Sequence, residues 1–213
     1  MVMLLDQCFS QLEQQVTNAI GIVRFLGTSP DSSTVISLLR SLCQQISFNY
    51  DLPTGDIPLD LISLTRHFRD ILDEATPEKP LIICLDAIDQ LSDIQTNASL
   101  STLWLPRKLP PHVKFIFSVM PGSHDTLPRL QKRIPVENFA EVQPLGDAFG
   151  MSILKSWLAY KQRTITPEQY TIVEEAIKGC SIPLYIKLVF NEIITWNSFS
   201  PVNTLVLSKT IEE

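Results

Sequence analysis

The run Leu81–Asp86 constrains this sequence most, because five consecutive apolar residues end abruptly on a carboxylate. The residues before it, Thr76–Pro80, include two prolines and are typical of a turn. A short apolar run after such a turn predicts a strand buried on both faces, as in a parallel sheet. Asp86 would then stand at the carboxyl end of the strand, the edge at which open α/β sheets bind ligands. In the simpler interpretation, Asp86 only begins a turn or caps a helix after a core strand.

The order of the remaining elements predicts an α/β layer followed by helices. Further strands are predicted at Ile20–Leu26, at Val113–Val119 and, shorter, at Val136–Val142. Apolar residues at helical spacing predict helices in segments 4–16, 35–46, 61–72, 127–134, 149–158, 166–179 and 183–196. We therefore predict an incomplete parallel sheet flanked by helices in residues 1–145, and an all-helical subdomain in residues 146–213.

The composition argues against several classes of partner. The chain has 213 residues and a net charge of −6, and its compact basic groups are the pairs Arg107-Lys108 and Lys132-Arg133. We interpret both pairs as solvated loop charge, too small for a surface that follows a nucleic-acid backbone. No apolar stretch approaches the length of a membrane span, and Met1–Asp6 lacks the basic region of a signal peptide. Four cysteines without a C-x-x-C motif indicate reduced core thiols, so we predict a cytoplasmic protein without nucleic-acid or membrane partners.

Four segments follow one another in a recognisable order: Ile22–Ser33, Leu81–Leu91, Lys114–Pro121 and Gly179–Tyr185. In this order they resemble the second strand, the Walker B segment, the sensor-1 strand and the helical-domain proline motif of NACHT domains. These are the domains of STAND-type signalling NTPases, and the resemblance is greatest to the NACHT proteins that carry WD repeats. The resemblance covers nearly the whole chain and implies a P-loop NTPase-type parallel sheet.

The resemblance implies a role for four residues. Asp86 would hold the Mg²⁺ of the nucleotide. Asp89 would stand near the acidic position that activates water, although Gln90 follows it where the family often shows a richer acidic cluster. Ser118 would occupy the sensor-1 end of its strand, and Pro183 would line the adenine pocket. Taken singly, Ser118 fits the end of a strand equally well, and Pro183 the start of a helix.

One part of such a site is missing from the sequence. No G-x-x-x-x-G-K-[ST] occurs, so the phosphate loop and its lysine, which supply most triphosphate contacts, are absent. We therefore expect ATP or GTP with Mg²⁺ as cofactor of a longer parent protein, and little or no nucleotide binding or hydrolysis by this chain. The family places its Walker A strand between the Walker B and sensor-1 strands. Without that strand the two strands would either close up and pair directly or leave open hydrophobic edges. Because closure would require packed helices to shift, we expect open edges and a chain that is poorly soluble or needs a partner strand.

Two functions remain open. The first is a partial NACHT module, in whose parent the nucleotide state sets the packing of the helical part and so controls oligomerisation and scaffolding. The second is a non-catalytic interaction module that acts through its helical surfaces. Both predict protein partners or self-association. An α/β hydrolase is not indicated, because no G-x-S-x-G occurs.

Overall fold

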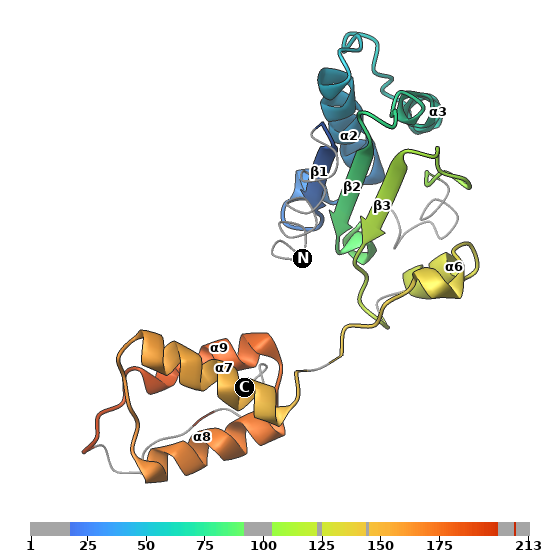
Figure 1. The fold of residues 1–213 in the computed structure, drawn as a ribbon. Coiled ribbons are helices and arrows are strands. Elements are labelled where there is room, and N and C mark those ends of the chain that lie inside the picture. Colours follow the sequence, from blue (N-terminus) through green and yellow to red (C-terminus); the bar gives the residue numbers. More distant parts are fainter. Residues whose placement is uncertain (1–17, 92–103, 123–124, 144, 200–206, 208–213) are drawn as a thin grey trace. The chain divides into compact units, whose positions relative to one another are not determined.

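The computed structural model describes residues 18–91, 104–122, 125–143, 145–199 and 207 (Figure 1). The chain divides into two compact units, residues 1–139 and 140–213, and each is described by itself. The helix predicted in residues 4–16 lies outside the described residues.

Three parallel strands form the sheet of the first unit, in the order β1 (Ile20–Phe25), β2 (Leu81–Asp86), β3 (Val113–Phe117) (Figure 1). The register pairs Phe25 with Asp86, and Leu85 with Phe117. The strands predicted at Ile20–Leu26 and Val113–Val119 are therefore confirmed. Since all connections between them are crossovers, the carboxyl ends of all three strands lie at one edge.

Strand β2 is buried on both faces, which confirms the prediction from its apolar run. Alternate residues face opposite sides of a strand. Leu81, Ile83 and Leu85 belong to the main core of the unit. Ile82 and Cys84 belong to a smaller cluster with Val23 and Ile116 on the other face. A continuous apolar run is therefore what this strand requires.

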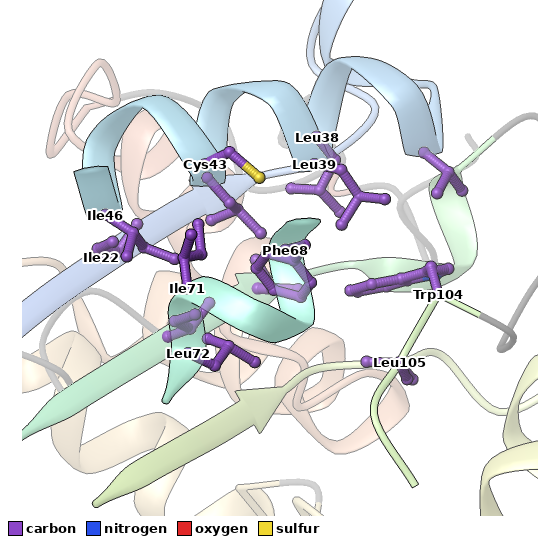
Figure 2. Close-up of a cluster of buried hydrophobic side chains, with 14 of the residues drawn as sticks. Ile22, Leu38, Leu39, Cys43, Ile46, Phe68, Ile71, Leu72, Trp104 and Leu105 are labelled. Carbon is purple, nitrogen blue, oxygen red and sulfur yellow. The ribbon is translucent and has the colours of Figure 1, made fainter. Parts of the chain in front are cut away.

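Two helices pack on one face of the sheet: α2 (Val35–Asn49) and α3 (Leu61–Leu72). The Thr34 hydroxyl caps α2 by accepting the Ser37 N–H at 3.1 Å, and the Asp60 carboxylate caps α3. Figure 2 shows Phe68 of α3 among the side chains of α2, with Trp104 on its other side. The ring centroids of Phe68 and Trp104 lie 6.4 Å apart. These contacts fill the core that supports the sheet.

The predicted gap between the strands Leu81–Leu85 and Val113–Val119 does not exist. Strand β2 pairs directly with β3 over five residue pairs, from Leu81–Val113 to Leu85–Phe117. The expectation of open hydrophobic edges between the two strands is therefore wrong, because direct pairing satisfies the backbone groups that face each other. The expectation of poor solubility, which depended on that gap, loses its basis.

The short strand predicted at Val136–Val142 is also wrong. The chain forms a single turn of 3-10 helix, η3 (Val136–Asn138), and is then irregular. Val136 is 84% exposed and Val142 95% exposed, so the apolar residues that suggested a strand find no surface to cover. The short helix predicted before it is present as α6 (Thr126–Gln131).

The described part of the second unit contains helices and no strand, as predicted. Helices α7 (Asp147–Tyr160), α8 (Pro167–Gly179) and α9 (Pro183–Ile193) enclose a core that includes Leu154 and Ile186. A β-carbon on Gly150 of α7 would lie 2.9 Å from Ile177 Cγ2 and 3.1 Å from Ile186 Cδ1, so this glycine lets the three helices approach closely. The predicted capping box is present, because Thr166 and Gln169 each accept the backbone N–H of the other.

Candidate functional site

The ends of β2 and β3 meet at the carboxyl edge of the sheet. The Ser118 N–H donates to the Leu85 carbonyl at 3.0 Å, one residue beyond the last strand pair. The Ile88 N–H donates in turn to the Ser118 carbonyl at 3.1 Å. These bonds continue the ladder past both strands, and they place Asp86 and Ser118 side by side, as the sequence predicts.

The Ser118 side chain links both sides of this edge. Its hydroxyl donates to Asp86 Oδ1 and accepts the Ala87 N–H at 2.7 Å. The Ser118 hydroxyl thus donates one hydrogen bond and accepts another, and both partners belong to the end of β2 and the residue after it. The remaining carboxylate oxygen of the half-buried Asp86 has no hydrogen-bond partner among the described residues. One Asp86 oxygen therefore joins β2 to the residue after β3, and the other has no partner among the described residues.

Asp89 lies in η2 (Ile88–Gln90) and is buried, with 1% of its surface exposed. Its Oδ1 accepts the Met120 N–H at 3.2 Å, and its Oδ2 accepts from Gln90 Nε2 at 3.0 Å. The Oδ1 bond joins the loop after β2 to the loop after β3, whereas the Oδ2 bond stays within η2. The predicted role of Asp89 near a reacting water stays a prediction, and the geometry gives this carboxylate a structural role.

Two backbone conformations at this edge favour glycine. Ala87 follows Asp86 in the left-handed region, with φ 58° and ψ 56°. Gly27, just after β1, has φ 73°, and a β-carbon there would lie 2.6 Å from Gln90 Cβ. The loop after β1 is therefore pressed against η2. Because the Leu26 N–H also donates to the Asp86 carbonyl at 3.1 Å, all three strand ends are joined.

Sequence reasoning singled out Asp86, Asp89 and Ser118 as candidates and missed the residues that contact them. Gly27 stood in an obvious turn, but nothing in the sequence marked its approach to Gln90. No pattern distinguished Ala87 or Met120, since their part comes from backbone groups rather than from side chains.

Pro183 belongs to the second unit, where it is exposed and is the first residue of α9. Proline is common at this position because its fixed φ suits a first helical turn. The simpler interpretation of Pro183, that it begins a helix, is confirmed. A place beside an adenine, and the same cleft as Asp86, stay predictions, because the two units are described separately.

The edge meets one requirement of a Mg²⁺–nucleotide site and lacks another. Mg²⁺ is usually held by one or two carboxylates together with substrate phosphates, and Asp86 keeps an oxygen for such a role. Within the described residues, no three His, Cys, Asp or Glu side chains are grouped to hold a metal ion. The sequence also provides no glycine-rich loop to hold phosphates. The residues of this chain therefore do not suffice to hold a Mg²⁺–nucleotide, and we derive no hydrolytic step from them.

The class of protein follows from the fold and this edge. A parallel sheet whose middle strand ends on an aspartate, beside a strand followed by a serine, is that of an incomplete P-loop NTPase-like α/β fold. No profile of a known protein family matches the chain. No solved structure matches it either. Among the described residues, no helix combines the length and apolar character needed to cross a membrane.

Curated proteins show what the sequence is similar to. The human NACHT and WD repeat domain-containing protein 2 is 33% identical over 198 residues, which are 92% of this chain and 11% of that protein. The human NACHT domain- and WD repeat-containing protein 1 is 30% identical over 215 residues, 95% of this chain and 13% of that protein. The mouse protein 1 is 32% identical over 213 residues. The chain is therefore related to the NACHT and WD repeat domain-containing proteins, and it spans between 11% and 13% of their length.

Proposed function

We propose that this chain is part of the nucleotide module of a STAND-type signalling NTPase, carrying its Walker B and sensor-1 strands. In a longer, cytoplasmic parent protein, ATP or GTP with Mg²⁺ would bind at the carboxyl edge of the sheet. The nucleotide state would then set the packing of the helical unit against the sheet, and through it oligomerisation and scaffolding. This chain by itself would not hydrolyse nucleotide, because its sequence contains no Walker A loop.

The observation that carries this proposal is the junction of Asp86 and Ser118. A carboxylate that ends the middle strand, hydrogen-bonded to a hydroxyl that follows its neighbour, occupies the edge where α/β sheets bind ligands. The relationship to NACHT proteins supports the same interpretation. In the bound parent, Asp86 would offer its second oxygen to the metal side of the nucleotide, and Ser118 would hold the Asp86 carboxylate in position.

A second candidate function is a protein-interaction module without nucleotide chemistry. Three apolar side chains near the start of α9 are more than two-fifths exposed: Ile182 at 49%, Leu184 at 56% and Leu188 at 46%. Exposed apolar groups on one helix favour contact with another protein surface. The missing Walker A loop supports this candidate for the chain as it stands.

Calorimetric titration with ATP and GTP in the presence of Mg²⁺ separates the two. We expect little or no binding by this chain. A fusion that adds a strand and a G-x-x-x-x-G-K-[ST] loop from a related NACHT protein before Met1 should bind nucleotide. Asp86→Asn should abolish that binding, whereas Asp56→Asn, which changes an exposed carboxylate away from the edge, should leave it intact.

Two outcomes would contradict the proposal. Low-micromolar binding by the present chain, abolished by Asp86→Asn, would show that the missing loop is dispensable. A folded fusion that binds neither nucleotide would favour the interaction module instead.

A further inference from the structure

Three hydroxyl residues in the described part of the chain directly precede a proline. The pairs are Ser29-Pro30, Thr76-Pro77 and Thr166-Pro167. Proline-directed protein kinases modify a hydroxyl in this position, because proline has no backbone N–H that their binding site would leave unsatisfied. An acidic residue follows each of the three prolines, and a cation comes next only after Thr76-Pro77-Glu78, where it is Lys79. The surroundings of each hydroxyl in the fold separate the three pairs further.

The hydroxyls of Thr166 and Ser29 cap helical segments. Thr166 is half-buried and forms the capping box that begins α8, so a phosphate there would remove the cap of a 13-residue helix. Ser29 forms a capping box at the 3-10 turn η1 (Pro30–Ser32). Its hydroxyl accepts the Ser32 N–H at 3.3 Å and donates to Ser32 Oγ at 3.2 Å. Both hydroxyls are therefore part of the structure that begins a helical segment.

Thr76 lies in a turn between α3 and β2. It is exposed, as are Pro77 and Glu78. The Lys79 N–H closes the turn by donating to the Thr76 carbonyl at 3.2 Å and to Thr76 Oγ1 at 3.1 Å. A residue before proline is biased toward extended backbone, the conformation in which kinases bind their substrates. Because the turn belongs to neither a helix nor a strand, it can open to a kinase without unwinding either.

The Lys79 side chain joins this turn to the end of α2. Its Nζ donates to the carbonyl of Asn49, the last residue of α2, and lies 5.1 Å from the centroid of the Tyr50 ring. The Tyr50 hydroxyl donates in return to the Lys79 carbonyl at 2.7 Å. A cation suits this place, because the C-terminal end of a helix carries a partial negative charge. The ammonium is thus held by a carbonyl and an aromatic ring, and neither of these carries a full charge.

We propose that Thr76 is a phosphorylation site, modified by a proline-directed protein kinase with ATP as the phosphoryl donor. Thr76 Oγ1 forms a bond to the γ-phosphorus while the bond from that phosphorus to the β–γ bridging oxygen breaks. ADP leaves, and the hydroxyl proton passes to the catalytic base of the kinase.

The phosphate changes the partner of Lys79. It carries a charge of about −1.5 to −2 at neutral pH, on an oxygen that lies 3.1 Å from the Lys79 backbone nitrogen and so within reach of the side chain. Charge-assisted hydrogen bonds are stronger than those to a neutral carbonyl. The Lys79 ammonium therefore leaves Asn49 and the Tyr50 ring for the phosphate, and the end of α2 loses its cation. This site does not depend on nucleotide binding by the chain.

Incubation of the chain with ATP and a purified cyclin-dependent or mitogen-activated protein kinase, in separate reactions, tests the site. Mass spectrometry of the digested chain should find phosphate on Thr76 and none on Ser29 or Thr166. Thr76→Val removes the acceptor, and Pro77→Ala keeps the acceptor but removes the proline, so each should abolish incorporation at this position. The matched control Ser29→Ala should leave it unchanged.

Nuclear magnetic resonance of the chain before and after the reaction tests the response of Lys79. Protons over the face of an aromatic ring resonate upfield. The signals of the Lys79 Cε protons should therefore move downfield when the ammonium leaves the Tyr50 ring. Lys187, which lies over the rings of Trp157 and Phe190 in the second unit, is an internal control whose signals should not move.

Three results would overturn the proposal. One is a Thr76 that neither kinase modifies, or that is modified no more than Ser29 and Thr166. A second is phosphorylation of a synthetic peptide of residues 72–82 but not of the folded chain, because the turn would then be closed to kinases. A third is a phosphorylated Thr76 that leaves the Lys79 signals unchanged. Thermal unfolding checks that Thr76→Val and Pro77→Ala, which both alter exposed residues, remain folded.

Discussion

Two regions of the first unit use charged side chains in different ways: the carboxyl ends of β2 and β3, and a basic hollow lined by Arg69, Arg107, Lys108 and Arg133. At the carboxyl end, Asp86 and Asp89 accept hydrogen bonds from Ser118, Gln90 and the Met120 N–H. One carboxylate, Asp73, is among the described residues that line the basic hollow. The first set includes the bonds that join the ends of β2 and β3, whereas cations predominate among the described lining residues of the hollow.

This difference separates two kinds of contribution. A buried polar group with internal partners stabilises the fold, because removing one partner leaves the other unsatisfied. Exposed like charges contribute little to stability. Variants at the carboxyl ends of β2 and β3 should therefore change the free energy of unfolding more than variants in the basic hollow.

The largest effect is expected at Gly27. Gly27→Ala forces a side chain into the left-handed region and against Gln90 Cβ, so we expect the free energy of unfolding to fall by about 2–4 kcal/mol. Urea denaturation measures it. Gly122→Ala shares the positive φ but meets nothing within 4 Å, and Gly55→Ala has neither constraint, so the three variants separate backbone strain from the clash. Equal losses of unfolding free energy for Gly27→Ala and Gly122→Ala would mean that Gln90 moves aside and the clash costs nothing.

Removing the Ser118 hydroxyl comes next. Ser118→Ala leaves the Ala87 N–H and Asp86 Oδ1 without their shared partner, and we expect a loss of about 1–3 kcal/mol. Ser118→Thr keeps a hydroxyl and should recover most of this loss. Ser156→Ala, which removes an exposed hydroxyl bonded within α7, serves as a control. An Ala variant as stable as the parent would show that water replaces the hydroxyl at no cost.

A gain in stability is expected at Ala87. Because its φ is 58°, Ala87→Gly should raise the free energy of unfolding by about 0.5–1 kcal/mol, after allowance for the greater freedom of glycine in the unfolded chain. The same substitution inside α8, Ala176→Gly, should lower stability, since glycine is unfavourable within a helix. Losses at both positions would mean that the left-handed conformation of Ala87 carries no strain.

The smallest change in stability is expected in the basic hollow. Arg107→Gln/Lys108→Gln should alter the free energy of unfolding by no more than about 0.5 kcal/mol, because both side chains are exposed. A loss as large as that of Ser118→Ala would remove the contrast between the two regions.

Most of the fold was predictable because the spacing of apolar residues along the sequence indicates which side chains are buried. The apolar run Leu81–Leu85 indicated a strand covered on both faces, and the helical spacing around Phe68 indicated the face of α3. The segment Val136–Val142 was predicted as a short strand, but the valines at its two ends are exposed. Their exposure shows that an apolar pattern forms a strand only where a neighbouring strand and a core are within reach.

The candidate site was predicted only in part. Asp86 and Ser118 could be paired from sequence because parallel strands end at one edge. The direct pairing of β2 with β3 could not, since it depends on which strands lie next to each other. The buried hydrogen bonds of Asp89 were equally beyond sequence, because the spacing of charges does not reveal which backbone N–H will face them.

The sequence by itself determined which segments become strands and helices, where a carboxylate follows the buried strand, and that no Walker A loop is present. Those properties are local, because they follow from side-chain periodicity and from motifs of adjacent residues. Only the tertiary structure decided that Gly27 presses on Gln90, that Ser118 bridges Asp86 and Ala87, and that Arg69, Arg107 and Arg133 line one hollow. These residues are far apart in the chain, and their interactions arise from the crossing of packed elements, which no local pattern encodes.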